Sequence, residues 1–169
     1  MACFFPIFLK LNHMDNTERL IENLNELIMI NYDRIAGYEK AAELTKTNDI
    51  DLTTIFNQME NDSRGYVEEL ETKIVALGGE PVVISTISGK IYRVWMDLKN
   101  VFTDSDKESI LESCEFGEDA AQKAYDQVLH SDTDINSEIR TLILDQKEEL
   151  NVSHDIIKKY RDLHHAFHK

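Results

Sequence analysis

The pattern of hydrophobic and polar positions along the chain predicts four long amphipathic helices. In the first, apolar residues recur every three or four positions, which is the spacing of one face of an α-helix. We expect this helix to begin at Asp15 or Thr17, either of which can accept hydrogen bonds from free backbone N–H groups at a helix start. The turn-forming residues 45–49 should end it. Its inward face is predicted to be Leu20, Leu24, Leu27, Asn31, Arg34, Tyr38 and Ala41.

A second helix is predicted from about residue 51 to residue 77. Gly78 and Gly79 should stop it, because glycine readily adopts the left-handed conformation that ends helices. The turn before it is short, so the first two helices should be antiparallel neighbours. The inward face is predicted to be Phe56, Met59, Ser63, Tyr66, Leu70 and Ile74.

Two further helices follow in the second half of the chain. One should run from about residue 106 to His130, and the other from about residue 134 to beyond Leu163. The inward residues of the third helix are Ile110, Leu111, Cys114, Glu118, Ala121, Tyr125 and Val128. Those of the fourth are Ile139, Leu142, Ile143, Gln146, Leu150, Ser153 or His154, Ile157 and Tyr160.

Residues 78–105 form a long connection between the second and third helices. Residues 80–89 are rich in β-branched side chains, but an isolated strand has no partner in a helical chain, so we interpret them as an extended crossover. Residues 90–102 predict a short amphipathic helix on which Trp95 packs over the bundle. Such a connection lets the second and third helices run parallel. The predicted fold is therefore all-α, a ferritin-like four-helix bundle whose long crossover carries a short extra helix.

Composition and charge limit the domain organisation, the cellular location and the kinds of partner that we expect. A chain of 169 residues favours one domain, which we place at 14–169, with residues 1–13 as a disordered extension and Met14 as an alternative start to Met1. The apolar stretch 2–9 is too short to span a membrane and lacks the features of a signal peptide, which favours a cytoplasmic protein. A net charge of −14 argues against nucleic acid or an anionic membrane as a partner. A second copy of the chain or a basic protein remains possible.

Polar residues interrupt the apolar faces halfway along the bundle, notably Asn31 in the first helix and Glu118 in the third. A tyrosine follows each of them seven residues later. In bundles of this kind, that level is where glutamates and Glu-x-x-His motifs hold a pair of metal ions. The interior therefore predicts either a metal site or a layer derived from one.

Four segments carry a resemblance to a known family: NYDRIAGYEKAA (31–42), LGGEP (77–81), WMDLK (95–99) and GEDAAQKAY (117–125). Together they resemble a family of uncharacterised bacterial four-helix-bundle proteins in the ferritin-like superfamily. The resemblance spans roughly residues 20–163. The family implies the fold but no activity, whereas the wider superfamily implies a di-iron or di-manganese carboxylate site.

The ligands implied by that superfamily are mostly replaced in this chain. Asn31 stands where the first helix should offer Glu, and Glu118 matches the equivalent residue of the third helix. The second helix has Asp62 but no histidine, and the fourth has His154 with Asn151 in place of the preceding Glu. Since two hard divalent cations need several carboxylates, we expect no cofactor. The alternative is one iron or manganese ion held by Glu118 and His154, with Asp62 or Glu149 as a further ligand.

The other interpretation is a polar layer that satisfies itself without metal. Glu118 would be costly if buried alone, so we predict that it pairs with Arg34 and that His154 lies close by. The full predicted layer is Asn31, Arg34, Tyr38, Asp62, Ser63, Tyr66, Glu118, Tyr125 and His154.

Three function hypotheses follow. The first is a structural or interaction protein without catalysis, which the replaced ligands favour. The second is a metalloprotein with the reduced site, and the third is a module whose acidic face recruits a basic protein. The chain has neither a phosphate-binding glycine loop nor a nucleophile–histidine pattern that would indicate an enzyme.

Overall fold

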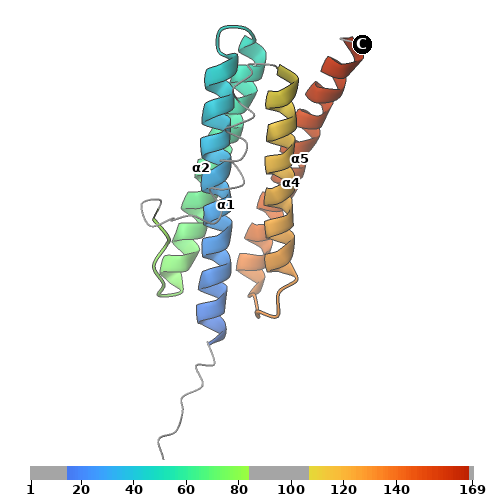
Figure 1. The fold of residues 1–169 in the computed structure, drawn as a ribbon. Helices are drawn as coiled ribbons and strands as arrows, with labels where there is room; N and C mark the ends of the chain where they lie inside the picture. Colours follow the sequence, from blue (N-terminus) through green and yellow to red (C-terminus); the bar gives the residue numbers. More distant parts are fainter. Residues whose placement is uncertain (1–14, 84–106, 168–169) are drawn as a thin grey trace, which may run out of the picture.

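In the part of the chain that the structure describes, four long helices pack as two antiparallel hairpins (Figure 1). The computed structural model describes residues 15–83 and 107–167. The first hairpin is α1 (Asn16–Thr45) and α2 (Ile50–Ala76), and the second is α4 (Lys107–Leu129) and α5 (Ser137–Phe167). These bounds agree with the four predicted helices to within a few residues.

The helix ends are fixed by the polar residues and glycines that flank them. Asp49 accepts a hydrogen bond from the Leu52 N–H at 2.9 Å, and Asn136 accepts one from the Ile139 N–H at 2.9 Å. Each bond satisfies a donor in the first turn of a helix. Gly78, with φ of +81°, turns the chain away after α2. The predicted glycine stop is thereby confirmed.

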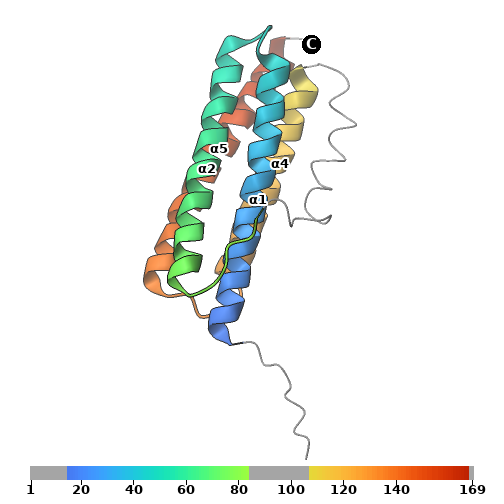
Figure 2. The ribbon, with the colours of Figure 1, turned by 90° about the vertical axis from the view of Figure 1, so that its left-hand side faces the viewer.

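The two hairpins are related as the long connection requires. Figures 1 and 2 both show α2 and α4 descending in the same direction, with α1 and α5 ascending. The predicted parallel arrangement of the second and third long helices is confirmed. The extension at 1–13 and the short helix at 90–102 lie outside the described residues, as does most of the extended crossover.

Apolar residues fill the bundle on both sides of a polar layer. One cluster includes Leu24 and Leu70, and the other includes Phe56 and Leu111. Every inward residue predicted for the first three helices is buried, while Leu142 and Tyr160 of α5 are only half-buried. None of the described helices has an apolar stretch long enough to cross a bilayer. The polar layer that interrupts this core is the candidate site.

Candidate functional site

An ion pair between Arg34 of α1 and Glu118 of α4 lies at the centre of the polar layer. The Nη2 atom of Arg34 is 2.7 Å from Oε1 of Glu118, and both side chains are fully buried. The Nη1 atom donates to the Ser63 hydroxyl at 2.8 Å, which in turn donates to the Met59 carbonyl at 2.7 Å. The predicted Arg34–Glu118 contact is confirmed, and α2 contributes to it through Ser63.

Aromatic side chains surround the guanidinium group. The Tyr38 hydroxyl donates to the same Glu118 oxygen that Arg34 binds. The Arg34 Cζ atom lies 5.6 Å from the ring centroid of Tyr38 and 6.0 Å from that of Tyr66. Since the face of an aromatic ring attracts a cation, both rings help to hold the buried positive charge.

Burial and the ion pair together set the ionisation of this cluster. Burial alone would lower the pKa of Arg34. The charge and hydrogen bond of Glu118, together with Tyr38 and Tyr125, outweigh that effect and leave the pKa above its usual value. Burial, followed by the charge of Glu118, raises the pKa of Tyr38 and that of Cys114. Arg34 therefore stays charged while the phenol and the thiol stay neutral. The thiol is a buried core residue, as the sequence indicated.

A second set of hydrogen bonds connects Asn31, Tyr125 and Gln146. The Asn31 amide donates to the Tyr125 hydroxyl at 2.8 Å, and that hydroxyl donates to Oε1 of Gln146 at 2.7 Å. The amide of Gln146 donates to Glu69 at 2.8 Å. Three helices thus meet through neutral groups at Tyr125, and Glu69 extends the chain of bonds to α2.

Asp62 and His154 make their contacts away from the Arg34–Glu118 pair, and so does the hydroxyl of Tyr66, although the Tyr66 ring lies over Arg34. Asp62 is half-buried and accepts a hydrogen bond from Gln58, and the Tyr66 hydroxyl donates to Glu149 at 2.6 Å. His154 lies 3.3 Å from Asp119, outside the buried layer. The expectation that His154 lies close to Glu118 is wrong. Successive residues of a helix point about 100° apart, and Ser153 takes the inward position in place of His154.

The donor set does not fit a pair of metal ions. Among the described residues, Glu118 is the one carboxylate that hydrogen-bonds to Arg34, and the oxygen that does so also binds Tyr38. His154, its proposed co-ligand, has its ring directed at Asp119. A divalent cation beside Arg34 would also meet a like charge at close range. The second oxygen of Glu118, Oε2, has no hydrogen-bond partner among the described residues. One free carboxylate oxygen does not make an iron or manganese site with His154, whose ring is directed at Asp119.

A different group of potential ligands lies near the C-terminal end of α5. Glu108, Glu112 and His165 can bring ligand atoms within 4.8 Å of one another, and Nε2 of His165 is 3.1 Å from Glu108. It is the one such group of three in the part of the chain that the structure describes. Its residues are exposed or half-buried, so a histidine–carboxylate contact explains it without a metal.

Several residues of interest were not singled out from the sequence. Gln146 stood on the predicted inward face, and its polar side chain was a signal that could have placed it in the layer. Asp33 is 6% exposed and lies on a row with the buried residues Ile30 and Gly37. That row was missed because α1 is buried over a wider arc than its apolar stripe indicates.

The bundle is similar in fold to a protein of known structure, and its sequence matches a protein family. A solved point mutant of Mycobacterium smegmatis Dps1 matches it with a TM-score of 0.72 at 13% sequence identity, over 86% of this chain and 97% of that chain. The shared fold, with α2 and α4 parallel, is that of a ferritin-like four-helix bundle. The chain belongs to the DUF2383 family, a domain of unknown function, whose sequence pattern matches residues 19–131. No curated protein sequence matches the chain.

Proposed function

We propose that this DUF2383 protein is a metal-free ferritin-like bundle with a non-catalytic structural or partner-binding role. The observation that carries the proposal is the buried Arg34–Glu118 pair, whose two side chains are both fully buried. A fixed guanidinium supplies the positive charge that metal ions would otherwise bring to a carboxylate in the bundle interior.

The remainder of the layer supports the same conclusion. Asn31 replaces the glutamate implied by the superfamily and donates its amide to Tyr125. An amide is a weak ligand with no charge, whereas it is a good hydrogen-bond donor. In the Arg34–Glu118 cluster and in the hydrogen bonds around Asn31, the side chains at the ligand positions bond to other side chains. A metalloprotein would use those positions to coordinate metal.

Elemental analysis of untagged protein, expressed in medium supplemented with iron and manganese, tests this proposal. We expect well under one metal equivalent per chain. The matched control is His165→Ala, because Glu108, Glu112 and His165 could scavenge a metal at the surface. About two equivalents of iron or manganese, retained in His165→Ala, would contradict the proposal.

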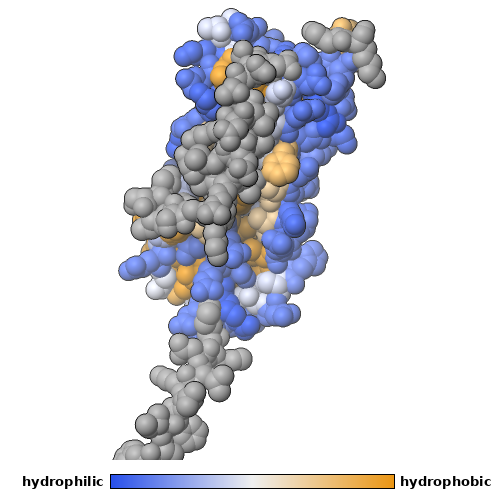
Figure 3. Space-filling model, in the orientation of Figure 1, coloured by the Kyte–Doolittle hydropathy of each residue, from blue (hydrophilic) through white to orange (hydrophobic). Residues whose placement is uncertain are grey.

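A second candidate role is recruitment of a basic protein through the acidic surface. The net charge is −14, and Figure 3 shows hydrophilic residues covering most of the described surface on one face. Such binding should weaken steeply between about 0.05 and 0.5 M salt, because salt screens exposed charges. Binding of a partner that is indifferent to salt would argue against this role.

A further inference from the structure

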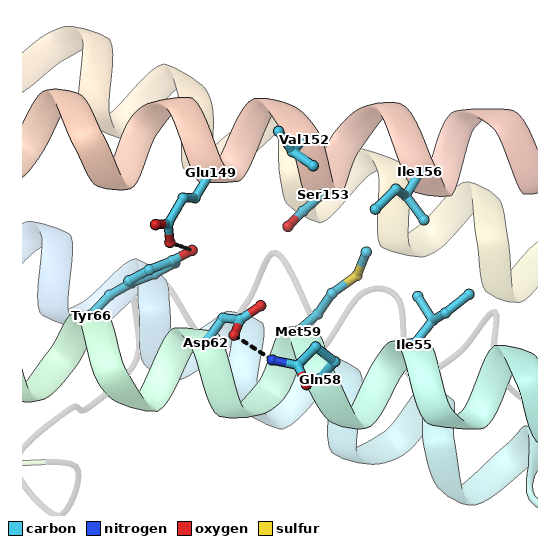
Figure 4. A pocket seen from close by; sticks show the side chains of 9 residues that line it. All are labelled: Ile55, Gln58, Met59, Asp62, Tyr66, Glu149, Val152, Ser153 and Ile156. Atoms are coloured by element: carbon cyan, nitrogen blue, oxygen red, sulfur yellow. Dashed lines mark hydrogen bonds between the residues drawn. The ribbon is translucent and has the colours of Figure 1, made fainter.

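A groove of about 420 Å³ runs between α2 and α5, and its two ends differ in chemistry (Figure 4). Ile55 of α2 and Ile156 of α5 face each other at one end, and Met59 extends toward them from α2. The other end holds polar side chains from both helices. Its volume falls within the range of small-molecule sites, roughly 300–1,000 Å³.

Two carboxylates at the polar end lack a cationic partner. Glu149 accepts a hydrogen bond from the Tyr66 hydroxyl, and Asp62 accepts one from the Gln58 amide at 2.7 Å. Both donors are neutral. Within residues 15–83 and 107–167, no lysine, arginine or histidine forms an ion pair with either carboxylate. The polar end therefore carries negative charge that the described protein does not neutralise.

Ser153 adds a hydroxyl group to this end. Its residue is 6% exposed, its oxygen points into the groove in Figure 4, and it has no hydrogen-bond partner in the described part of the chain. Two buried serines of the other helices bond to the preceding turn: Ser63 donates to Met59 and Ser113 donates to Ser109, each at 2.7 Å. A serine in a helix can make that bond to the carbonyl four residues earlier. The hydroxyl of Ser153 is instead available to a ligand.

We propose that this groove binds a free primary alkylammonium ion. The ammonium group lies among Asp62, Glu149 and Ser153, and the alkyl chain extends along Met59 and Ile156. An ammonium group has three N–H donors and no acceptor, which matches two carboxylates and one hydroxyl oxygen. A bare metal ion fits less well, because the apolar half of the groove offers it no ligands.

Calorimetric titration with hexylammonium tests the proposal. We expect binding of hexylammonium and none of hexanoate, which has the same chain but the opposite charge. Asp62→Asn combined with Glu149→Gln should weaken binding by at least about tenfold, because hydrogen bonds between an ammonium group and a carboxylate are stronger than those to a neutral acceptor. The matched control is Glu68→Gln with Asp145→Asn, which removes two exposed carboxylates from the same two helices and should change affinity by less than about twofold.

Several outcomes would overturn the proposal. These are no binding of hexylammonium up to about 10 mM, which corresponds to less than roughly 3 kcal/mol, equal binding of hexanoate, or equal weakening by both pairs of substitutions. Tighter binding of N-acetyl-lysine methylamide than of hexylammonium would point to a lysine in a peptide instead. If the Asp62/Glu149 variant fails to fold, methyl NMR of the native protein decides. Hexylammonium must then shift the signals of Met59 and Ile156, and shifts confined to other methyl groups would refute the site.

Discussion

At the scale of single residues, the polar layer is centred on one ion pair and two neutral hydroxyl groups, those of Ser63 and Tyr38, that hydrogen-bond to it. Arg34 gains a carboxylate from α4 and a hydroxyl from α2, and Tyr38 shares the carboxylate. Removing either charge leaves the other buried without its partner. A buried charge in that position destabilises the folded state far more than the loss of the contact itself.

The first prediction follows from that coupling. Arg34→Met and Glu118→Leu should each lower the free energy of unfolding by roughly 3–5 kcal/mol. The double variant should be more stable than either single variant, because no unpaired charge remains. It should still fall below the native protein, since the Tyr38 hydroxyl loses its acceptor. Urea unfolding of the four proteins measures this, and additive losses would mean that the two residues are not coupled.

Asp33 provides the second prediction, through the dependence of stability on pH. Burial raises its pKa to about 7, and its Oδ2 atom has no hydrogen-bond partner among the residues that the structure describes. The unfolded chain should titrate near the usual value of about 3.9. The folded state then holds the proton more tightly, so this group's contribution to stability is complete below pH 4. It is lost as the pH rises through about 7.

Asp33→Asn should remove that loss, because the amide cannot ionise. The variant should gain stability relative to the native protein between about pH 4 and pH 7, by at most about 1.4 kcal/mol per pH unit. The difference should then stay constant above pH 7. Unfolding by urea at each pH provides the measurement, with the exposed Asp51→Asn as the control. Native and Asp33→Asn curves that stay parallel across the range would contradict the assignment.

At the residue scale, the sequence predicts contacts for residues in the middle of an apolar stripe but not for those at its border. The Arg34–Glu118 contact could be predicted because both residues stand on strong apolar stripes, where an unpaired charge is too costly. Which of Ser153 and His154 points inward could not be predicted, because adjacent residues on a helix border the same apolar stripe. Which one turns inward depends on how α5 is rotated against α4, and periodicity alone does not fix that rotation.

At the scale of the helices, starts and stops were predictable because they depend on local chemistry. Asp49 and Asn136 accept backbone hydrogen bonds within three residues, and Gly78 supplies a positive φ. The sparse contact between α2 and α5 was not predictable, because it depends on how the two hairpins lean against each other. The groove and the placement of Asp62, Glu149 and Ser153 along it therefore appear only in the structure.

Two glycines on or just after α2 give the third prediction. Gly78→Ala should destabilise the protein by about 1 kcal/mol, because its φ of +81° is costly for a residue with a Cβ atom. Gly65→Ala should stabilise it by up to about 1 kcal/mol, because Gly65 is inside a helix and a Cβ there would meet no atom within 4 Å. Thermal unfolding of both variants checks the pair of signs. A loss of stability in Gly65→Ala would show that this glycine serves a close contact after all.

At the scale of the whole molecule, the length of one connection decided the topology. A link of more than 25 residues between α2 and α4 allows them to run parallel. The identity of the interior could not be predicted from topology, because the same bundle can enclose metal ions or side chains. In this protein Arg34 occupies the middle of the bundle interior, where metal ions would otherwise lie. We propose that the molecule folds and acts without metal.

The fourth prediction tests that central claim with one measurement, the free energy of unfolding in chelator and in excess manganese. Using His165→Ala in both solutions removes the surface cluster from consideration. A metal that binds only the folded state must stabilise it, by about 2.7 kcal/mol at one hundred times its dissociation constant. We expect the two free energies to agree within about 0.5 kcal/mol, the usual size of small surface effects. A clear rise in manganese that Glu118→Gln abolishes would contradict the account and restore a metal to the bundle interior.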